Sequence, residues 1–414
     1  MSGLNYLEKL LDGAGVEWKR LGDVAKYVRG LTYNKSSEST DGQGYRVLRA
    51  NNITLSGNCL NLTDVKVVRF DTKVKEAQKL YKHDILISAA SGSREHVGKV
   101  AYIESDIDYY FGGFMGVVRC DEKLNPRYLF HVFTSYIFQK YLDEMLNVST
   151  INNLNSTVMG EFNIPIPCPE NPAKSLEIQS EIVRILDTFS ALTNELTNEL
   201  KLRRKQYNYY RDKLLTFDEG EVEWKTLGDV AQYSQTRISF DQLDETNHVG
   251  VDNLLQNRAG KTFSSHVPTS GKLTEFRHND ILIGNIRPYL KKIWQSDCIG
   301  GTNGDVLVIR CTYGAINPGY LYQVLADDKF FEYNMQHVKG AKMPRGNKKN
   351  ILNYPIPVPL LTEQVRIATM LDKFDTLTNS ITEGLPREIE LRKKQYEYYR
   401  DLLFSFPKPT HVDN

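Results

Sequence analysis

The sequence contains one framework twice. Residues 16–25 (VEWKRLGDVA) return as residues 222–231 (VEWKTLGDVA), 206 positions later. Further segments return in the same order: residues 84–87 as 280–283, 125–129 as 317–321, 164–169 as 354–359, and 205–212 as 394–401. Ordered repeats of this kind correspond to duplicated structural units. Each copy is therefore predicted to consist of a globular part, a proline-rich hinge and a long helix.

Between these matching segments the two copies differ almost completely. The offset falls from 206 residues at the first segment to 190 at the Pro-Ile-Pro hinge, so most of the length difference lies in loops. A constant framework around divergent loops suggests two binding modules of one design with different ligands. The N-terminal piece fits the same plan, because residues 6–11 echo residues 210–215, which makes the repeat circular.

Both long helices have the apolar spacing of a coiled coil. We expect them to pack on each other in antiparallel orientation, because a globular module lies between them in the chain. At 1.5 Å per residue, a helix over residues 177–215 is roughly 58 Å long, which predicts a spacer. The apolar positions are Ile178, Ile182, Ile185, Phe189, Leu192, Leu196, Leu200, Tyr207, Tyr210 and Leu214 in the first helix, and Ile367, Met370, Phe374, Leu377, Ile381, Leu385, Ile389, Tyr396, Tyr399 and Leu403 in the second.

Two local features modify these helices. A tandem tetrapeptide, TNEL at residues 193–196 and again at 197–200, puts two successive four-residue steps into the first stripe. The second helix contains Gly384 and Pro386, and a proline inside a helix removes a hydrogen bond and clashes with the preceding turn. We therefore expect a kink or a break near Leu385.

The composition is typical of a globular protein, which we expect in the cytoplasm. Hydrophobic residues make up 41% and charged residues 25%, and the net charge is only +1, so any contact with nucleic acid must be local. No apolar run approaches the roughly 20 residues needed to cross a bilayer, and the N-terminal segment lacks the features of a secretory signal. The five cysteines form no CxxC pair, which argues against a zinc site or a disulfide framework.

Taken together, these features resemble the specificity subunit of Type I restriction-modification systems. The resemblance is carried by the Trp-Lys-x-Leu-Gly-Asp-Val-Ala openings, the Asp-Ile-Leu-Ile strands, the Pro-Ile-Pro hinges and the helices ending in Lys-Gln-Tyr-x-Tyr-Tyr-Arg-Asp. It covers nearly the whole chain. It implies two target-recognition domains, each of which reads one half of a bipartite site on double-stranded DNA.

The resemblance also implies partners. The helices would hold the domains apart and bind two methyltransferase (modification) subunits, which transfer methyl from S-adenosylmethionine to adenine. Restriction subunits, which use ATP and Mg, would join the complex to translocate and cut unmodified DNA. No cofactor, metal or membrane is expected on this chain itself.

The predicted fold class is α/β. Two similar α/β target-recognition domains are joined and spaced by two long antiparallel coiled-coil helices, with an internal pseudo-twofold repeat. The predicted boundaries are residues 1–170 for the first domain, 171–216 for the central helix, 217–360 for the second domain, 361–406 for the returning helix and 407–414 for a loose tail.

Loops rich in Arg, Lys, Asn and Ser follow the predicted strands, and these residue types supply base readout and phosphate contacts. An ordinary solvated loop is the alternative for each of them. The candidate DNA contacts are Arg46, Arg49, Asn51, Asn52, Ser91, Ser93, Arg94 and Lys99 in the first module, and Asn285, Arg287, Tyr289, Lys291, Lys342, Arg345, Lys348 and Lys349 in the second.

Basic runs near the two helix ends are candidates for binding a partner subunit. Contact with DNA phosphates, or a solvated helix face, would also explain them. The residues in question are Arg203, Arg204, Tyr207, Arg392, Lys393 and Tyr396.

The sequence motifs of a catalytic centre are missing. An adenine methyltransferase would need an Asn/Asp-Pro-Pro-Tyr tetrapeptide and a glycine-rich turn for the methyl donor. Residues 260–262 (GKT) imitate the end of a phosphate loop, but Leu255 stands where that loop requires glycine. We therefore expect a non-catalytic chain. Two alternatives stay open: a specificity chain that pairs with a fused methylase-nuclease, and a coiled-coil scaffold without DNA function, which the divergent basic loops disfavour.

Overall fold

The computed structural model describes residues 3–54, 57–91, 93–148, 153–218, 220–340 and 342–407. Its internal contacts divide the chain into two compact units. Unit 1 combines Met1–Leu192 with Lys393–Asn414, and unit 2 is the continuous stretch Thr193–Arg392. The predicted tail beyond residue 407 lies outside the described residues, as do Gly92 and Ala341 of two predicted loops.

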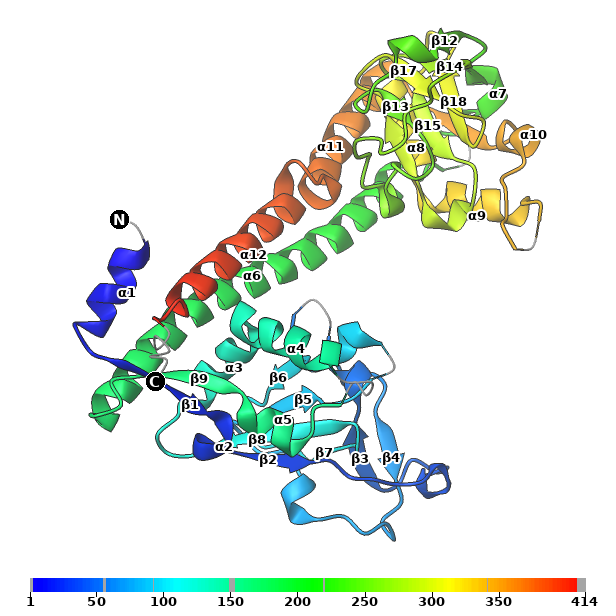
Figure 1. Cartoon of the computed structure of the whole chain (residues 1–414). Coiled ribbons are helices and arrows are strands. Elements are labelled where there is room, and N and C mark those ends of the chain that lie inside the picture. Colours follow the sequence, from blue (N-terminus) through cyan, green and yellow to red (C-terminus); the bar gives the residue numbers. More distant parts are fainter. Residues whose placement is uncertain are drawn as a thin grey trace. The chain divides into compact units, whose positions relative to one another are not determined.

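A four-stranded antiparallel sheet forms the centre of unit 1 (Figure 1). Its strand β5 is buried on both faces. Ile85 and Ile87 pack in one core with helix α3, while Leu86 packs in another core with Leu48 and Phe111 of a second sheet. An uninterrupted apolar run is what a strand covered on both sides requires. The order of the first sheet is β2 (Ala25–Arg29), β8 (Met115–Cys120), β5 (Ile85–Ser88), β6 (Val100–Tyr102); that of the second is β4 (Lys66–Val68), β3 (Tyr45–Leu48), β7 (Tyr110–Phe111).

Helices and a short ribbon complete unit 1. The Pro-Ile-Pro hinge forms strand β9 (Asn163–Pro167), which pairs antiparallel with β1 (Val16–Arg20) and places Trp18 opposite Pro165. This two-stranded ribbon tolerates prolines because the missing N–H groups face no further strand. The helices are α1 (Gly3–Leu11), α2 (Leu21–Val24), α3 (Pro126–Thr134), α4 (Tyr136–Val148) and α5 (Ser156–Glu161).

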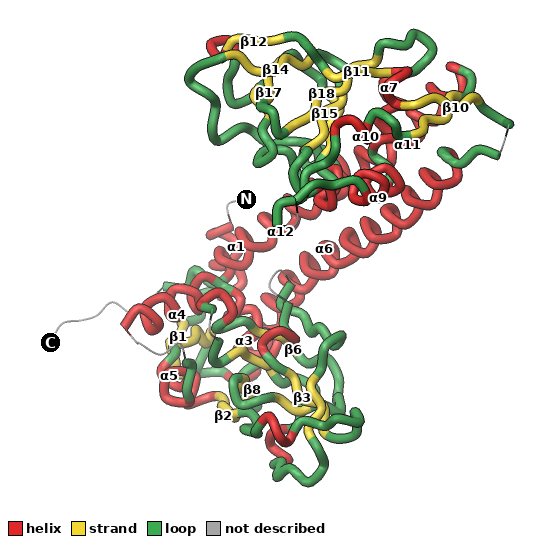
Figure 2. Tube along the Cα trace, turned by 90° about the vertical axis from the view of Figure 1, so that its right-hand side faces the viewer, coloured by secondary structure: helices red, strands yellow, loops and turns green. Residues whose placement is uncertain are grey.

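Unit 2 repeats this plan with short strands and long loops (Figure 2). Its first sheet has the same antiparallel order, β11 (Ala231–Tyr233), β18 (Val306–Cys311), β15 (Ile281–Gly284), β16 (Ile293–Gln295). The second has the order β12 (Arg237–Ser239), β14 (Lys272–Phe276), β17 (Gly300–Thr302), β13 (His248–Val249). The ribbon pairs β10 (Glu223–Thr226) with β19 (Pro355–Val358), and the helices are α7 (Leu227–Val230), α8 (Pro318–Leu325), α9 (Asp328–Gln336) and α10 (Lys348–Ile351).

Each unit is stabilised internally by buried contacts that have an equivalent in the other unit. The Tyr128 hydroxyl donates to the carbonyl of Pro165 at 2.8 Å, and the Tyr320 hydroxyl donates to that of Pro357 at 3.0 Å. In the repeated Asp-Ile-Leu-Ile motif the aspartate, as well as the apolar residues, stabilises the fold. Its aspartate is buried and ion-paired in each unit, Asp84 with Arg119 at 2.8 Å and Asp280 with Arg310 at 2.7 Å.

The observed long helices match the predicted ones, except that the second is divided in two. Helix α6 (Pro172–Leu214) is continuous over 43 residues. The returning segment is two helices, α11 (Leu361–Asn379) and α12 (Gly384–Leu403), so the interruption expected near Leu385 is a break, and residues 361–406 do not form one continuous helix. The chain leaves the helix at Ser380, upstream of Leu385, and Pro386 lies in the first turn of α12, where no intrahelical N–H bond is lost.

Each unit contains its own portion of helix packing. In unit 2, Arg204 of α6 donates to the carbonyl of Thr378, while Tyr210, further along α6, stacks on Phe374 with ring centroids 5.6 Å apart. Because the residue numbers increase along α6 while those of its contact residues on α11 decrease, the two helices are antiparallel. In unit 1, Phe189 of α6 stacks on Tyr399 of α12 at 5.2 Å.

Two predicted members of the stripes lie outside this packing. Leu192 is 37% exposed, and Ile381 is 39% exposed within the break. Conversely, the stripes missed Leu186 and Leu371, which are fully buried because they face the cores of units 1 and 2. The helices therefore use two faces, one for each other and one for the modules.

Candidate nucleic-acid interface and helix surface

In both units a candidate DNA-binding loop leaves the central sheet at the same place. The Ser88 N–H donates to the carbonyl of Lys99 at 2.8 Å and closes the loop from β5 to β6. The Gly284 N–H donates to the carbonyl of Lys292 at 3.0 Å and closes the loop from β15 to β16. The structure thus gathers Ser91, Ser93, Arg94 and Lys99 on one loop, and Asn285, Arg287, Tyr289 and Lys291 on its equivalent.

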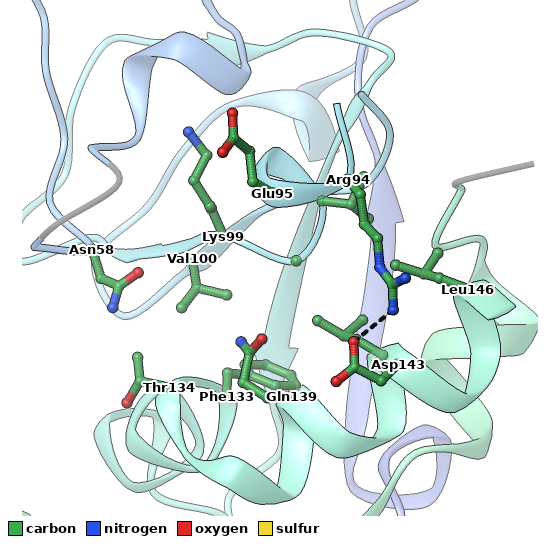
Figure 3. A pocket seen from close by; sticks show the side chains of 13 residues that line it. Asn58, Arg94, Glu95, Lys99, Val100, Phe133, Thr134, Gln139, Asp143 and Leu146 are labelled. Atoms are coloured by element: carbon green, nitrogen blue, oxygen red, sulfur yellow. Dashed lines mark hydrogen bonds and ion pairs between the residues drawn. The ribbon is translucent and has the colours of Figure 1, made fainter. Parts of the chain in front are cut away.

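The loop of unit 1 borders a pocket of about 560 Å³, with helix α4 on the opposite side (Figure 3). The Arg94 guanidinium reaches across to Asp143, where it donates to a carboxylate oxygen at 2.7 Å. Both side chains are more than half exposed, so the ion pair stabilises the fold by at most about 1 kcal/mol. Contact of Arg94 with DNA therefore stays a prediction.

The side chain of Lys99 bonds to the protein backbone instead of extending into solvent. Its ammonium donates to the carbonyls of Ala50 and Ile53 at 3.0 and 2.8 Å, and burial lowers its pKa. Lys292, which the sequence reasoning missed, does the same in unit 2 by donating to the carbonyl of Val251, and burial lowers its pKa as well. The two lysines lie at equivalent positions, opposite Ser88 and Gly284, which indicates a structural role. DNA contact by Lys99 is therefore not supported.

Two candidate residues after β3 share one acceptor, Asp64. Arg49 and Asn51 both donate to its carboxylate, at 2.9 and 3.1 Å, and Arg46 is exposed beside the ring of Tyr109. Asn52 is different, since it is 1% exposed and its amide donates to two loop carbonyls, those of Asn61 and Asp64. Its burial argues against the predicted base contact.

The buried asparagine also has an equivalent in unit 2. Asn253 is 3% exposed, and its amide donates to the carbonyls of His248 and Thr262. Both asparagines bond a carbonyl nine residues further along the chain, Asn61 and Thr262 respectively. The loop after β3 is therefore repeated after β13, although the sequences RANN and GVDN hide the relation.

In unit 2, Arg287 and Tyr289 are exposed, and Tyr289 has 50% of its surface in solvent. Lys291 is tied to helix α9 by an ion pair with Asp328 at 2.8 Å. Asn285 is only 5% exposed, so it lies beneath the loop, and direct base contact by this side chain is not supported.

The predicted basic loop before the second hinge presents most of its cations to solvent. Lys342, Lys348 and Lys349 are exposed, and Asn347 caps helix α10 by accepting from the N–H of Lys349. Arg345 is also exposed and forms an ion pair with Asp305 at 2.6 Å.

Of the candidate partner-binding residues, the two tyrosines point inward. Tyr207 is 2% exposed and its hydroxyl lies within hydrogen-bond distance of Gln323 and Asp375, so its burial argues against the predicted partner contact. Tyr396 is partly buried, and its hydroxyl lies 3.0 Å from Nδ1 of His131.

The four basic candidates lie on the helix surface. Arg203 and Arg392 each donate to a glutamate one turn earlier, Glu199 and Glu388, both at 2.7 Å. Arg204 bonds the carbonyl of Thr378, and Lys393 is exposed. These positions leave partner contact by the cations as a prediction.

Exposed apolar side chains, which the stripes did not include, accompany these cations. Leu202 and Tyr209 are 60% and 61% exposed and lie seven residues, or two turns, apart on α6. Leu391 and Tyr398 are 44% and 63% exposed with the same spacing on α12. The repeated strings LRRKQYNY and LRKKQYEY contain both pairs, so the sequence did carry the signal.

Among the described residues, no group of His, Cys, Asp and Glu could hold a metal ion. Within the same stretches, no helix is long and apolar enough to span a membrane.

Two copies of one α/β module, with different loops on the same framework, define a duplicated binding protein. The chain belongs to the family of Type I restriction modification DNA specificity domains, which matches residues 14–203 and 219–391. It is 36% identical to the Type I restriction enzyme EcoR124I/EcoR124II specificity subunit of Escherichia coli over 429 residues, covering 100% of both chains.

Solved structures agree with this fold. The crystal structure of the Type I restriction-modification system S subunit from M. genitalium is similar with a TM-score of 0.58 at 15% identity, over 96% of this chain and 98% of that one. A structure from work on complex assembly and conformational transition of the type I R-M system has a TM-score of 0.52 at 16% identity, over 94% of this chain and 97% of the other.

Proposed function

We propose that this chain is the DNA sequence-specificity subunit of a Type I restriction-modification enzyme, and that each unit reads one half of a bipartite site. One observation carries the proposal. The two units share the strand order of their first sheet and their buried contacts, yet the loops at the same edge of that sheet present different side chains. A constant framework with variable loops is suited to two different DNA half-sites, with exposed arginines and lysines on the loops for phosphates and bases.

In the proposed complex, helices α6 and α12 dock two methyltransferase subunits. The paired surfaces support this, because Leu202 with Tyr209 and Leu391 with Tyr398 present the same apolar spacing twice among exposed cations. Exposed tyrosines are typical anchors of protein interfaces, and here each lies beside an exposed leucine that extends the apolar surface. Restriction subunits would join through the methyltransferases.

Catalysis is proposed to reside in the partners. S-adenosylmethionine would bind the methyltransferase subunits, and ATP with Mg would bind the restriction subunits, while this chain selects the DNA. The relative from Escherichia coli is itself called a specificity subunit, which supports this division of labour.

The test is co-expression of this chain with the methyltransferase subunit encoded beside it, followed by single-molecule mapping of N6-methyladenine on a plasmid. We expect methylation confined to one split motif and lost when either protein is omitted. Stable co-purification without methylation would contradict the proposal and favour a scaffold.

A further inference from the structure

Three chain segments meet in the same way beside the candidate loops of both units. In unit 1 the Ala89 N–H donates to the carbonyl of Phe114 at 2.9 Å, and the Leu154 N–H donates to that of Ala89 at 2.7 Å. In unit 2 the Asn285 N–H donates to the carbonyl of Asp305 at 2.8 Å, and the Gly346 N–H donates to that of Asn285 at 3.0 Å.

These bonds place Phe114 and Asp305 at one equivalent position. Phe114 directly precedes strand β8, and Asp305 directly precedes the equivalent strand β18. Each backbone carbonyl accepts a hydrogen bond from the residue that follows the neighbouring strand, β5 in unit 1 and β15 in unit 2. The third segment is equivalent too, since Asn153 forms an isolated bridge with Ala90 as Arg345 does with Ile286.

The side chains at this shared position have opposite chemistry. Phe114 is 73% exposed, whereas Asp305 is ion-paired to Arg345 at 2.6 Å. A single exposed phenylalanine would not by itself mean much. The comparison of the two units adds to it, because one backbone position carries an apolar ring in unit 1 and an Arg–Asp pair in unit 2, and this difference fits the reading of two different bases.

We infer that this shared position is a base-reading position. Phe114 contacts the C5-methyl group of a thymine in one half-site, and Arg345, oriented by Asp305, donates to O6 and N7 of a guanine in the other. The chemistry follows the pattern of the major groove, where the thymine methyl is the apolar feature and the guanine edge offers two acceptors to a guanidinium. A carboxylate beside the guanidinium holds its planar fork in one orientation.

This inference rests on the proposed function, and the experiment separates the two. The complex with methyltransferase is first used to map the split motif. Failure of the wild-type complex to methylate any split motif would overturn the proposed function itself, and with it the base-reading inference.

The decisive measurement uses oligonucleotides that carry the mapped motif. Each thymine is replaced in turn by deoxyuridine, which lacks only the methyl group. We expect one substitution, in one half-site, to weaken binding of the wild-type complex by about three- to tenfold, the loss of one methyl contact. The Phe114→Ala complex should bind more weakly and respond to none of the substitutions.

The matching measurement in the other half-site replaces guanines by 7-deazaguanine, which lacks the N7 acceptor. One position should weaken wild-type binding roughly tenfold and leave the Arg345→Ala complex unaffected. Asp305→Asn should weaken this discrimination, because the guanidinium loses its charged partner.

Phe70→Ala is the control, because Phe70 is also exposed in unit 1, at 63%, but follows strand β4 and packs edge-on against Tyr45. It should keep the deoxyuridine response. A Phe114→Ala complex with an unchanged response, or a Phe70→Ala complex with the same loss, would overturn the inference while leaving the proposed function intact.

Discussion

A histidine and a glutamine perform the same structural task in the two units. His131 is buried between Asp187, 2.9 Å from Nε2, and the hydroxyl of Tyr396. In unit 2 the Gln323 amide donates to Asp372 at 2.7 Å, and its oxygen accepts from Tyr207 at 3.2 Å. A neutral histidine with its proton on Nε2 donates and accepts at the same two places, so the two side chains are interchangeable in hydrogen bonding.

Replacing His131 tests this equivalence. His131→Gln should leave the free energy of unfolding of unit 1 within about 1 kcal/mol, whereas His131→Leu removes one hydrogen bond from each of Asp187 and Tyr396 and should cost about 2 kcal/mol. Denaturant unfolding of both variants checks the difference. Equal losses for glutamine and leucine would contradict the assigned contacts.

The same residue predicts a pH dependence. Burial lowers the pKa of His131, while Asp187 raises it and Arg127 and Arg400 lower it further. Because the folded-state pKa lies below the unfolded value of about 6.5, the unfolded chain takes up the proton first as the pH falls. The contribution of His131 to stability is therefore complete above about pH 6.5 and decreases below it. Unfolding measured across this range should show a weaker pH dependence in His131→Gln, and an identical profile would refute the assignment.

Single-residue roles were the least predictable part of the site. Spacing correctly gathered Ser91, Ser93 and Arg94 on one loop, because that required only a loop after a strand. It could not show that Lys99 and Asn52 turn back to bond carbonyls of their own framework. Both residue types are equally suited to DNA and to loop carbonyls, and only the folded backbone decides which they reach.

At the scale of helices and strands, the repeat and the apolar spacing were sufficient for most of the architecture. The position of the break was not, because Gly384 and Pro386 were read as interrupting a helix. The structure ends α11 at Asn379 and begins α12 at Gly384, so the proline starts a helix instead. Leu186 and Leu371 were missed because the coiled-coil stripe describes only one face of each helix.

The paired helix surfaces predict a change in stoichiometry. The double variant Leu202→Glu with Tyr209→Glu places charges where an apolar contact is proposed, and each lost anchor should weaken one contact about tenfold or more. The complex should then retain one methyltransferase copy instead of two, as native mass spectrometry would show. Asn198→Glu, exposed on the same helix, should retain both copies. Two copies on the double variant would exclude this surface.

The tandem tetrapeptide makes a prediction about the DNA site. Residues 193–200 lie within the uninterrupted helix α6. Four helical residues correspond to roughly 6 Å, while one base pair of B-DNA rises about 3.4 Å. Deleting residues 197–200 should therefore shorten the gap between the half-sites by one or two base pairs and leave the half-sites unchanged, as methylation mapping would show. An unchanged gap would sink the spacer idea.

At the scale of the whole molecule, unit 1 depends on both chain ends. Phe404, the residue after helix α12, is fully buried against Tyr128, with ring centroids 5.4 Å apart, and Leu7 of the first helix lies in the same core. The Trp18 indole N–H donates to the carbonyl of Pro407 at 3.1 Å. In unit 2 the equivalent of Phe404 is Leu215, which packs on its core within a continuous stretch of chain.

These positions predict damage confined to one unit. Phe404→Ala should destabilise unit 1 by about 3 to 5 kcal/mol, because it leaves a large cavity in a closed core. Hydrogen exchange should increase in unit 1 and stay unchanged in the core of unit 2, while Leu215→Ala should give the reverse pattern with a smaller effect. Increased exchange in both cores of one variant would contradict the division.

The circular construction has a consequence for synthesis on the ribosome. The module that emerges first lacks the residues from Lys393 onward that belong to it, so it waits, with part of its core uncovered, until translation is nearly complete. The module that emerges second is already continuous and can finish first. A premature stop codon shortly before Lys393 would therefore spare the later half of the protein and cost the cell the earlier one.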